Sequence, residues 1–194
     1  MADKFLGIAH IAYNLKRKVS AKKKSVVRAL LDETCASIPD AARDSIIKHW
    51  SQAPTLIDFR DSVFVESRPN DGGMVTNVGR LIYFRHDILL RMPPEVAKAM
   101  LAHELAHVFV LSSLDELRKI VAMAEQEGHC KISFKGTWDE IGLDPESADW
   151  NFRVIEGKYL IFKESFYLRL IEMRVRLVNR EWGFDEDALA AWEG

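Results

Sequence analysis

The segment at residues 95–113, EVAKAMLAHELAHVFVLSS, restricts the fold of this chain more than any other segment. Its alanines, leucines and valines predict a long core helix, and the prolines at residues 93 and 94 are typical of a helix start. His103, Glu104 and His107 interrupt this apolar pattern. Because such polar groups are costly to bury without partners, we expect one side of the helix to pack in the core and the other to face a cleft.

The spacing of these three polar residues is that of a metal site. His107 follows His103 by four residues, which places both imidazoles on one face of a helix, one turn apart. Two such rings can reach one tetrahedral ion at Zn–N distances near ~2 Å. Glu104 lies beside that ion, where its carboxylate can take a proton from a bound water. The HExxH pattern therefore predicts two zinc ligands, His103 and His107, and one general base, Glu104.

Composition bounds the class of protein. A chain of 194 residues with 48% hydrophobic and 29% charged residues can bury a core without disulfides. The net charge of −2 gives no strong field for nucleic acid, and any such contact would use the basic run from Lys16 to Lys24, which we expect to be a solvated helix face.

Cys35 and Cys130 form no CxxC pair, and neither a signal peptide nor an apolar run of about 18 residues is evident. We therefore expect a cytoplasmic protein that does not enter a membrane.

Apolar periodicity divides the chain into helical and β-rich stretches. The turn sequence RPNDGG separates two β-rich stretches, residues 56–67 and 74–85, which suggests an antiparallel pair. Residues 129–157 are expected to be irregular, and a short acidic helix is expected to close the chain. Besides the segment at 95–113, helices are predicted over residues 4–17, 24–36, 39–53, 114–128 and 159–181.

These stretches together predict the fold class and the domains. The fold is expected to be α+β, with a small antiparallel or mixed sheet packed on the helix at 95–113 and with additional N- and C-terminal helices. Residues 1–36 would form a helical N-terminal extension. Residues 37–194 would form the domain that holds the metal site.

One long string resembles a known family. Residues 80–109, RLIYFRHDILLRMPPEVAKAMLAHELAHVF, resemble the strand, turn and active-site helix of zincin metallopeptidases. LAHELAHV is typical of the gluzincin branch, which includes the ImmA/IrrE-like metallopeptidases. The resemblance implies a zincin-like fold, bound Zn²⁺, and hydrolysis of peptide bonds in a specific protein substrate by a zinc-bound water that Glu104 activates. Because ImmA/IrrE-like relatives act on repressor proteins, the implied partner is a protein or peptide substrate of a repressor-like kind.

The resemblance also implies the third zinc ligand. The family takes it from a glutamate on a later helix, in an ExxAD pattern, and in many relatives that helix ends in a WGFD-like string. EMRVRLVNREWGFD at residues 172–185 places Glu172 on the family ligand. Arg176 stands where the family has an aspartate that steadies a ligand histidine, and arginine cannot accept a hydrogen bond. Either another carboxylate orients the histidine, or the site is weaker than in the relatives.

Other residues remain open as the third ligand. Glu164 lies two turns before Glu172 on about the same face of the predicted helix. The segment DPESADW at residues 144–150 offers Glu146 and Asp149, for which turn formation and helix capping are the simpler interpretation. His129, next to Cys130, could complete a site with three nitrogen ligands or with a thiolate, although EGHCK is typical of a helix end.

Peptide hydrolysis would need a donor for the oxyanion and a place for the peptide. Tyr167, His129 and His86 are the candidates for the donor. Zincins bind an extended peptide along the edge of their sheet, and the resemblance implies that the strand at about 80–85 is this edge.

Two other functions compete with the peptidase. The first is a catalytically weak or inactive zincin scaffold that acts as a protein-binding or regulatory module. Arg176 favours this alternative, whereas Glu104 argues against it because a scaffold needs no base. The second is a zinc amidase such as peptide deformylase, whose cysteine ligand precedes the HExxH motif, whereas EGHC follows it here.

Overall fold

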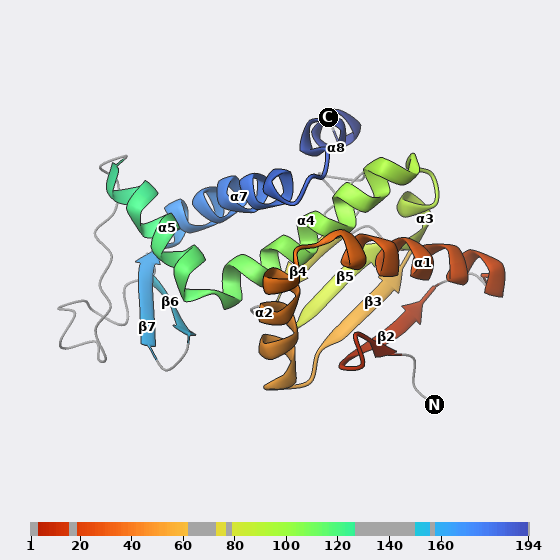
Figure 1. The fold of residues 1–194 in the computed structure, drawn as a ribbon, viewed down its shortest axis with the longest axis horizontal. Helices are drawn as coiled ribbons and strands as arrows, with labels where there is room; N and C mark the ends of the chain where they lie inside the picture. Colours follow the sequence, from red (N-terminus) through yellow and green to blue (C-terminus); the bar gives the residue numbers. More distant parts are fainter. Residues whose placement is uncertain are drawn as a thin grey trace.

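The computed structural model describes residues 4–15, 19–61, 73–76, 79–126, 150–155 and 158–193 (Figure 1). The described chain is a mixed α+β fold, with one five-stranded mixed sheet and one two-stranded hairpin. This confirms the predicted α+β class with a mixed sheet, whereas the zincin-like fold stays a prediction. None of the described helices has the length and apolar character needed to cross a membrane.

The five-stranded sheet has the order β1-β2-β3-β5-β4. The three central strands are parallel, and they align Ile11, Ile57 and Ile82 side by side. The two outer strands, β1 and β4, run antiparallel to their neighbours. The strands are β1 (Lys4–Phe5), β2 (Ala9–Asn14), β3 (Leu56–Arg60), β4 (Gly73–Thr76) and β5 (Leu81–Arg85).

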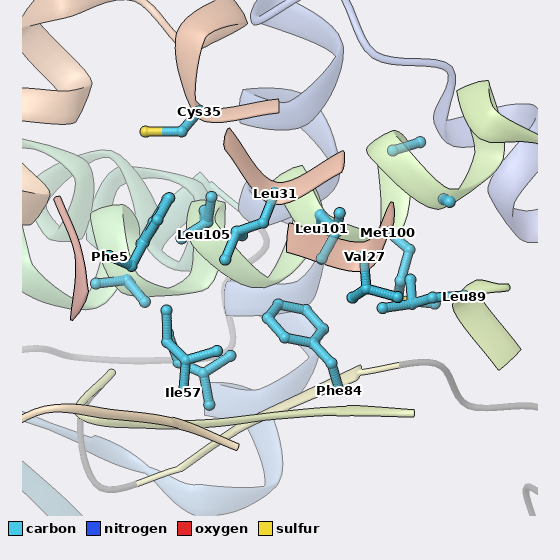
Figure 2. Close-up of a cluster of buried hydrophobic side chains, with 14 of the residues drawn as sticks. Phe5, Val27, Leu31, Cys35, Ile57, Phe84, Leu89, Met100, Leu101 and Leu105 are labelled. Carbon is cyan, nitrogen blue, oxygen red and sulfur yellow. The ribbon is translucent and has the colours of Figure 1, made fainter. Parts of the chain in front are cut away.

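The first four helices cover one face of this sheet (Figure 1). They are α1 (Ala21–Ser37), α2 (Asp40–Ser51), α3 (His86–Leu89) and α4 (Pro94–Ser112). Figure 2 shows Ile57 and Phe84 rising from the sheet toward Leu101 of α4 and Leu31 of α1. All four side chains are fully buried, so this layer is the main hydrophobic core.

The opposite side of α4 packs in a second core. Ala106 and Val110 of α4 lie there with Val175 and Val178, two valines of the long helix α7 (Glu164–Glu181). Leu117 of α5 (Leu114–Gln126) completes this core. The remaining elements are β6 (Trp150–Ile155), β7 (Lys158–Lys163) and α8 (Glu186–Glu193). A helix buried on two sides has to be apolar nearly all round, which explains the composition of residues 95–113.

A buried ion pair fixes α7 against α5. The Nε of Arg174 donates to Oε2 of Glu116 at 2.5 Å, and its Nη1 contacts Oε1 of Glu181 at 2.9 Å. Burial alone would raise the pKa of Glu116, but the hydrogen bonds from Arg174 and Lys119 hold it below its ordinary value. Because Glu172 lies two residues before Arg174, this pair also limits where Glu172 can lie.

The helix predicted over residues 4–17 is wrong, because the described part of this segment forms β1 and β2. Leu6 and Gly7 have φ values of +52° and +72°, which a right-handed helix cannot contain. β2 pairs in parallel with β3, and α1 packs on α4. The described part of residues 1–36 therefore shares the sheet and core of the chain and is not a purely helical extension.

The predicted antiparallel pairing of the β-rich stretches does not hold for the described residues, and residues 62–67 lie outside them. β3 pairs in parallel with β5, and residues 74–85 contain parts of two antiparallel strands, β4 and β5. The chain reverses between these two strands, where Gly79 has a φ of +76°. β5 therefore lies inside the sheet, between β3 and β4, and is not the edge that the sequence predicted.

The remaining predicted helices agree with the structure, except near residue 160. α1, α2, α4 and α5 match the helices predicted over 24–36, 39–53, 95–113 and 114–128, and α8 is the short acidic helix. The helix predicted from residue 159 begins only at Glu164, because residues 158–163 pair with β6. Residues 127–149 lie outside the described residues, and residues 150–155, which were expected to be irregular, form β6 instead.

The basic run is described only in part, since residues 16–18 lie outside the described residues. The first turn of α1 contains Lys22, Lys23 and Lys24. Ser20 caps this helix, because its side-chain oxygen accepts a hydrogen bond from the backbone N–H of Lys23. Lys22 and Lys23 are exposed, as expected for a solvated helix face.

Candidate metal centre

His103 and His107 lie on the side of α4 that faces α7. Their rings are one helical turn apart, with centroids separated by 5.0 Å and planes inclined at 67°. Both side chains are mostly buried, because α7 covers them. The predicted arrangement of two imidazoles on one helix face is therefore present, and the two rings approach a second helix.

Glu172 reaches both histidines from α7. Its Oε1 lies 3.3 Å from Nε2 of His103, and its Oε2 lies 3.3 Å from Nε2 of His107. Ligand atoms of the three residues all lie within 4.8 Å of one another. Two ligands held at ~2 Å from a tetrahedral ion are separated by about 3.3 Å, so this donor set suits zinc.

The side chains of the other candidates for the third ligand are not among those described. Within the ranges that the structure describes, His103, His107 and Glu172 form the one group of at least three such side chains that could hold a metal. Glu164 is the first residue of α7, and its side chain is not among those described. Three further candidates lie outside the described residues, namely His129, Glu146 and Asp149.

Glu104 lies beside the histidines on α4, on the side toward β4. Its side chain is buried against the backbone of Gly73. A Cβ atom added to Gly73 would lie 2.5 Å from Cγ of Glu104 and 2.7 Å from its Oε1. The absence of a side chain at residue 73 thus makes room for the predicted base, and no pattern in the sequence marks this glycine as part of the site.

A buried carboxylate that the sequence did not predict lies behind His103. Oε1 of Glu186, the first residue of α8, is 2.7 Å from Nδ1 of His103. Nδ2 of Asn179 donates to the same carboxylate oxygen at 2.5 Å and to the backbone carbonyl of Ala99 at 3.0 Å. Glu186 and Asn179 are both buried, so the back of the site is closed by side chains of α7 and α8.

Arg176 contacts the candidate ligand Glu172 and not a histidine. Its Nε donates to Oε1 of Glu172 at 3.1 Å, and its side chain is 48% exposed. Arg176, which stands where the resemblance implies an aspartate, therefore lies at the solvent side of the cluster, whereas Glu186 contacts His103 from the buried side.

The charges of the metal-free cluster are coupled. Burial alone would lower the pKa of His103, but its hydrogen bonds to Glu172 and Glu186 outweigh burial and raise the pKa to about 10. Burial alone would raise the pKa of Glu172, but hydrogen bonds with His103 and His107 hold it well below its usual range. The metal-free site therefore holds a protonated His103 beside an ionised Glu172 near neutral pH.

Of the three candidate oxyanion donors, only the side chain of His86 is described, and the structure describes no contact between it and the cluster. His86 is buried at the start of α3, where its charged neighbours are Asp87, Lys23 and Asp61, and burial lowers its pKa. The side chain of Tyr167 is not among those described, and His129 lies outside the described residues.

Comparisons of this chain with protein-family models, with curated proteins and with solved structures find no match. The zincin resemblance of residues 80–109 therefore stays a prediction, and any proposed function rests on the geometry of His103, His107 and Glu172.

Zinc content tests the ligand assignment. Purified protein supplied with zinc should hold about one ion per chain, whereas His107→Ala should lose most of it because only two ligands remain. His10→Ala is the control, since His10 is exposed on β2. Elemental analysis by mass spectrometry measures both variants, and full retention by His107→Ala would contradict the assignment.

Zinc binding should release a proton from His103. Below its metal-free pKa of about 10, this imidazole carries protons on both nitrogens, and an ion can bind Nε2 only after that proton has left. Near pH 8 we expect roughly one proton from His103 per zinc bound, with affinity falling as the pH is lowered. Calorimetry in buffers with different ionisation enthalpies measures this release. A binding heat that is the same in every buffer would contradict the prediction.

Proposed function

We propose that this protein is a zinc-dependent metallopeptidase that hydrolyses peptide bonds of a specific protein substrate. One observation carries the proposal: two histidines one turn apart and a glutamate from a second helix converge within 4.8 Å, next to the glutamate of the HExxH motif. This donor set leaves one position of a tetrahedral ion open, as catalytic zinc sites require.

Each residue has a distinct task in this proposal. His103, His107 and Glu172 would hold the ion, which when bound acts as a Lewis acid toward a carbonyl and lowers the pKa of a coordinated water. Glu104 takes a proton from the attacking water and passes it to the leaving amine. The Glu104 side chain packs on Gly73 of β4, so it would lie next to a peptide that adds to this strand.

The position of β4 supports an extended peptide as the substrate. β4 is the last strand of the described sheet, and its Gly73 packs directly on Glu104. A peptide that adds to this strand would gain main-chain hydrogen bonds and run past the base. The edge that we propose for binding is therefore β4 and not the strand at 81–85, which lies inside the sheet. By the family resemblance, the substrate would be a repressor-like regulator.

A protein-binding scaffold without catalysis is the second candidate. One contact favours it: Arg176 holds Oε1 of Glu172, the oxygen nearest His103, and so competes with a metal ion for that ligand. Glu104 favours the peptidase, because a scaffold needs no general base next to the histidines.

Glu104→Gln separates the two candidates. This variant should keep its zinc but lose hydrolysis by about 10²- to 10⁴-fold, because glutamine cannot accept the proton. Glu95→Gln, an exposed position in the first turn of the same helix, is the control and should retain activity. Cleavage is measured by mass spectrometry on a library of peptides from a cellular protein digest and on intact repressor-like proteins. A wild-type protein that cuts none of them but binds one tightly is a scaffold.

Gly73→Ala tests the proposed placement of the base. The added methyl group must push Glu104 aside, which should lower hydrolysis by about 100-fold while zinc content is unchanged. Met74→Ala is the control, since neighbouring side chains of a strand point to opposite faces. Peptide cleavage and zinc content are measured together. Unchanged cleavage by Gly73→Ala would show that Glu104 does not act from this position.

A further inference from the structure

We propose that Glu186 is a positioning residue of the metal centre. Its carboxylate holds the His103 ring so that Nε2 of this ring faces the ion. The inference rests on the proposed metal site of His103, His107 and Glu172. Its geometric basis is the 2.7 Å contact between Oε1 of Glu186 and Nδ1 of His103.

The chemistry of this contact selects one tautomer. An ionised carboxylate only accepts hydrogen bonds, so the His103 nitrogen that faces Glu186 carries the hydrogen. With Nδ1 protonated in this way, the lone pair available for a metal lies on Nε2. Nε2 is the nitrogen that faces Glu172, at 3.3 Å.

A specific helix ending brings Glu186 to this place. At the end of α7, the Gly183 backbone N–H donates to the Arg180 carbonyl at 2.9 Å, and the Phe184 N–H donates to the Asn179 carbonyl at 3.1 Å. This is a Schellman motif, and Gly183 has the φ of +88° that the motif requires. The chain turns there, and α8 packs back on α4 with Leu189 buried in the main core.

Asn179 fixes the carboxylate to the helix that carries the histidine. Its Nδ2 donates both to Oε1 of Glu186 and to the carbonyl of Ala99. In an α-helix the carbonyl of Ala99 is the acceptor for the backbone N–H of His103. Asn179 therefore ties the carboxylate that contacts the His103 ring to the carbonyl that accepts from the His103 backbone N–H.

The burial of Glu186 argues against a purely structural role. Its side chain is 4% exposed, and a buried carboxylate is costly unless charged or polar groups compensate it. The neighbouring Asp187 is 85% exposed and pairs with Arg180, and Asp185 already caps α8 by accepting from the Ala188 N–H. α8 thus has other acids for its N-terminus, whereas Glu186 is directed inward onto a metal-ligand candidate.

Zinc affinity provides the first test. Glu186→Gln keeps the size of the side chain but removes its charge, and it should weaken zinc binding by about 10- to 100-fold in competition with a chelator. Asp187→Asn is the matched control on the same turn of α8 and should bind within about twofold of wild type, because exposed ion pairs contribute little. Equal affinities of Glu186→Gln and wild type would overturn the inference but leave the metal site standing.

The tautomer of His103 provides a second test, which does not depend on a variant that folds. In zinc-loaded wild-type protein labelled with ¹⁵N-histidine, NMR should show a protonated Nδ1 on His103 and a metal-bound Nε2. Coordination through Nδ1 would overturn the inference. A wild-type chain that binds no zinc at all would overturn the proposed function together with it.

Discussion

The burial of α4 on two opposite sides is the constraint on which the rest of the structure depends. The side with Leu101 and Leu105 packs on the sheet, and the side with Ala106 and Val110 packs on α5 and α7. A helix held from both sides cannot rotate or slide without opening one of the two cores. Its polar side chains therefore lie between the two cores. His103 and His107 face α7, and Glu104 faces β4.

The elements around α4 meet this constraint by specific contacts and not by apolar packing alone. Arg174 of α7 is buried and pairs with Glu116 of α5, and Glu172 on the same helix faces both imidazoles. The Schellman turn at Gly183 then returns the chain, so that Glu186 approaches His103 from behind. The histidine thus lies between two carboxylates, one on the side of the proposed ion and one on the buried side. Arg176 stands where the resemblance implies an aspartate, and the carboxylate that contacts Nδ1 of His103 comes from Glu186 of α8 instead.

Several expectations failed where contacts between distant segments outweighed local preference. Residues 8–13 have apolar positions that are compatible with a helix, but pairing with β3 and the left-handed residues Leu6 and Gly7 make this segment a strand. Residues 74–85 appeared to form one strand, but the reversal before Leu81 divides them into β4 and β5 and moves the sheet edge to β4. In both segments the deciding hydrogen bonds join strands whose pairing a local pattern cannot specify.

The sequence by itself determined the helix and its three polar residues, because the spacing of His103, Glu104 and His107 combined with 3.6 residues per turn sets their relative placement. Glu172 could be named only through the family resemblance. Gly73, Asn179 and Glu186 were decided by the tertiary structure alone. Glu186 meets His103 across 83 residues of chain, and no periodicity connects them. Their meeting depends on how α7 ends and where α8 packs, which follow from burial and backbone geometry rather than from spacing along the chain.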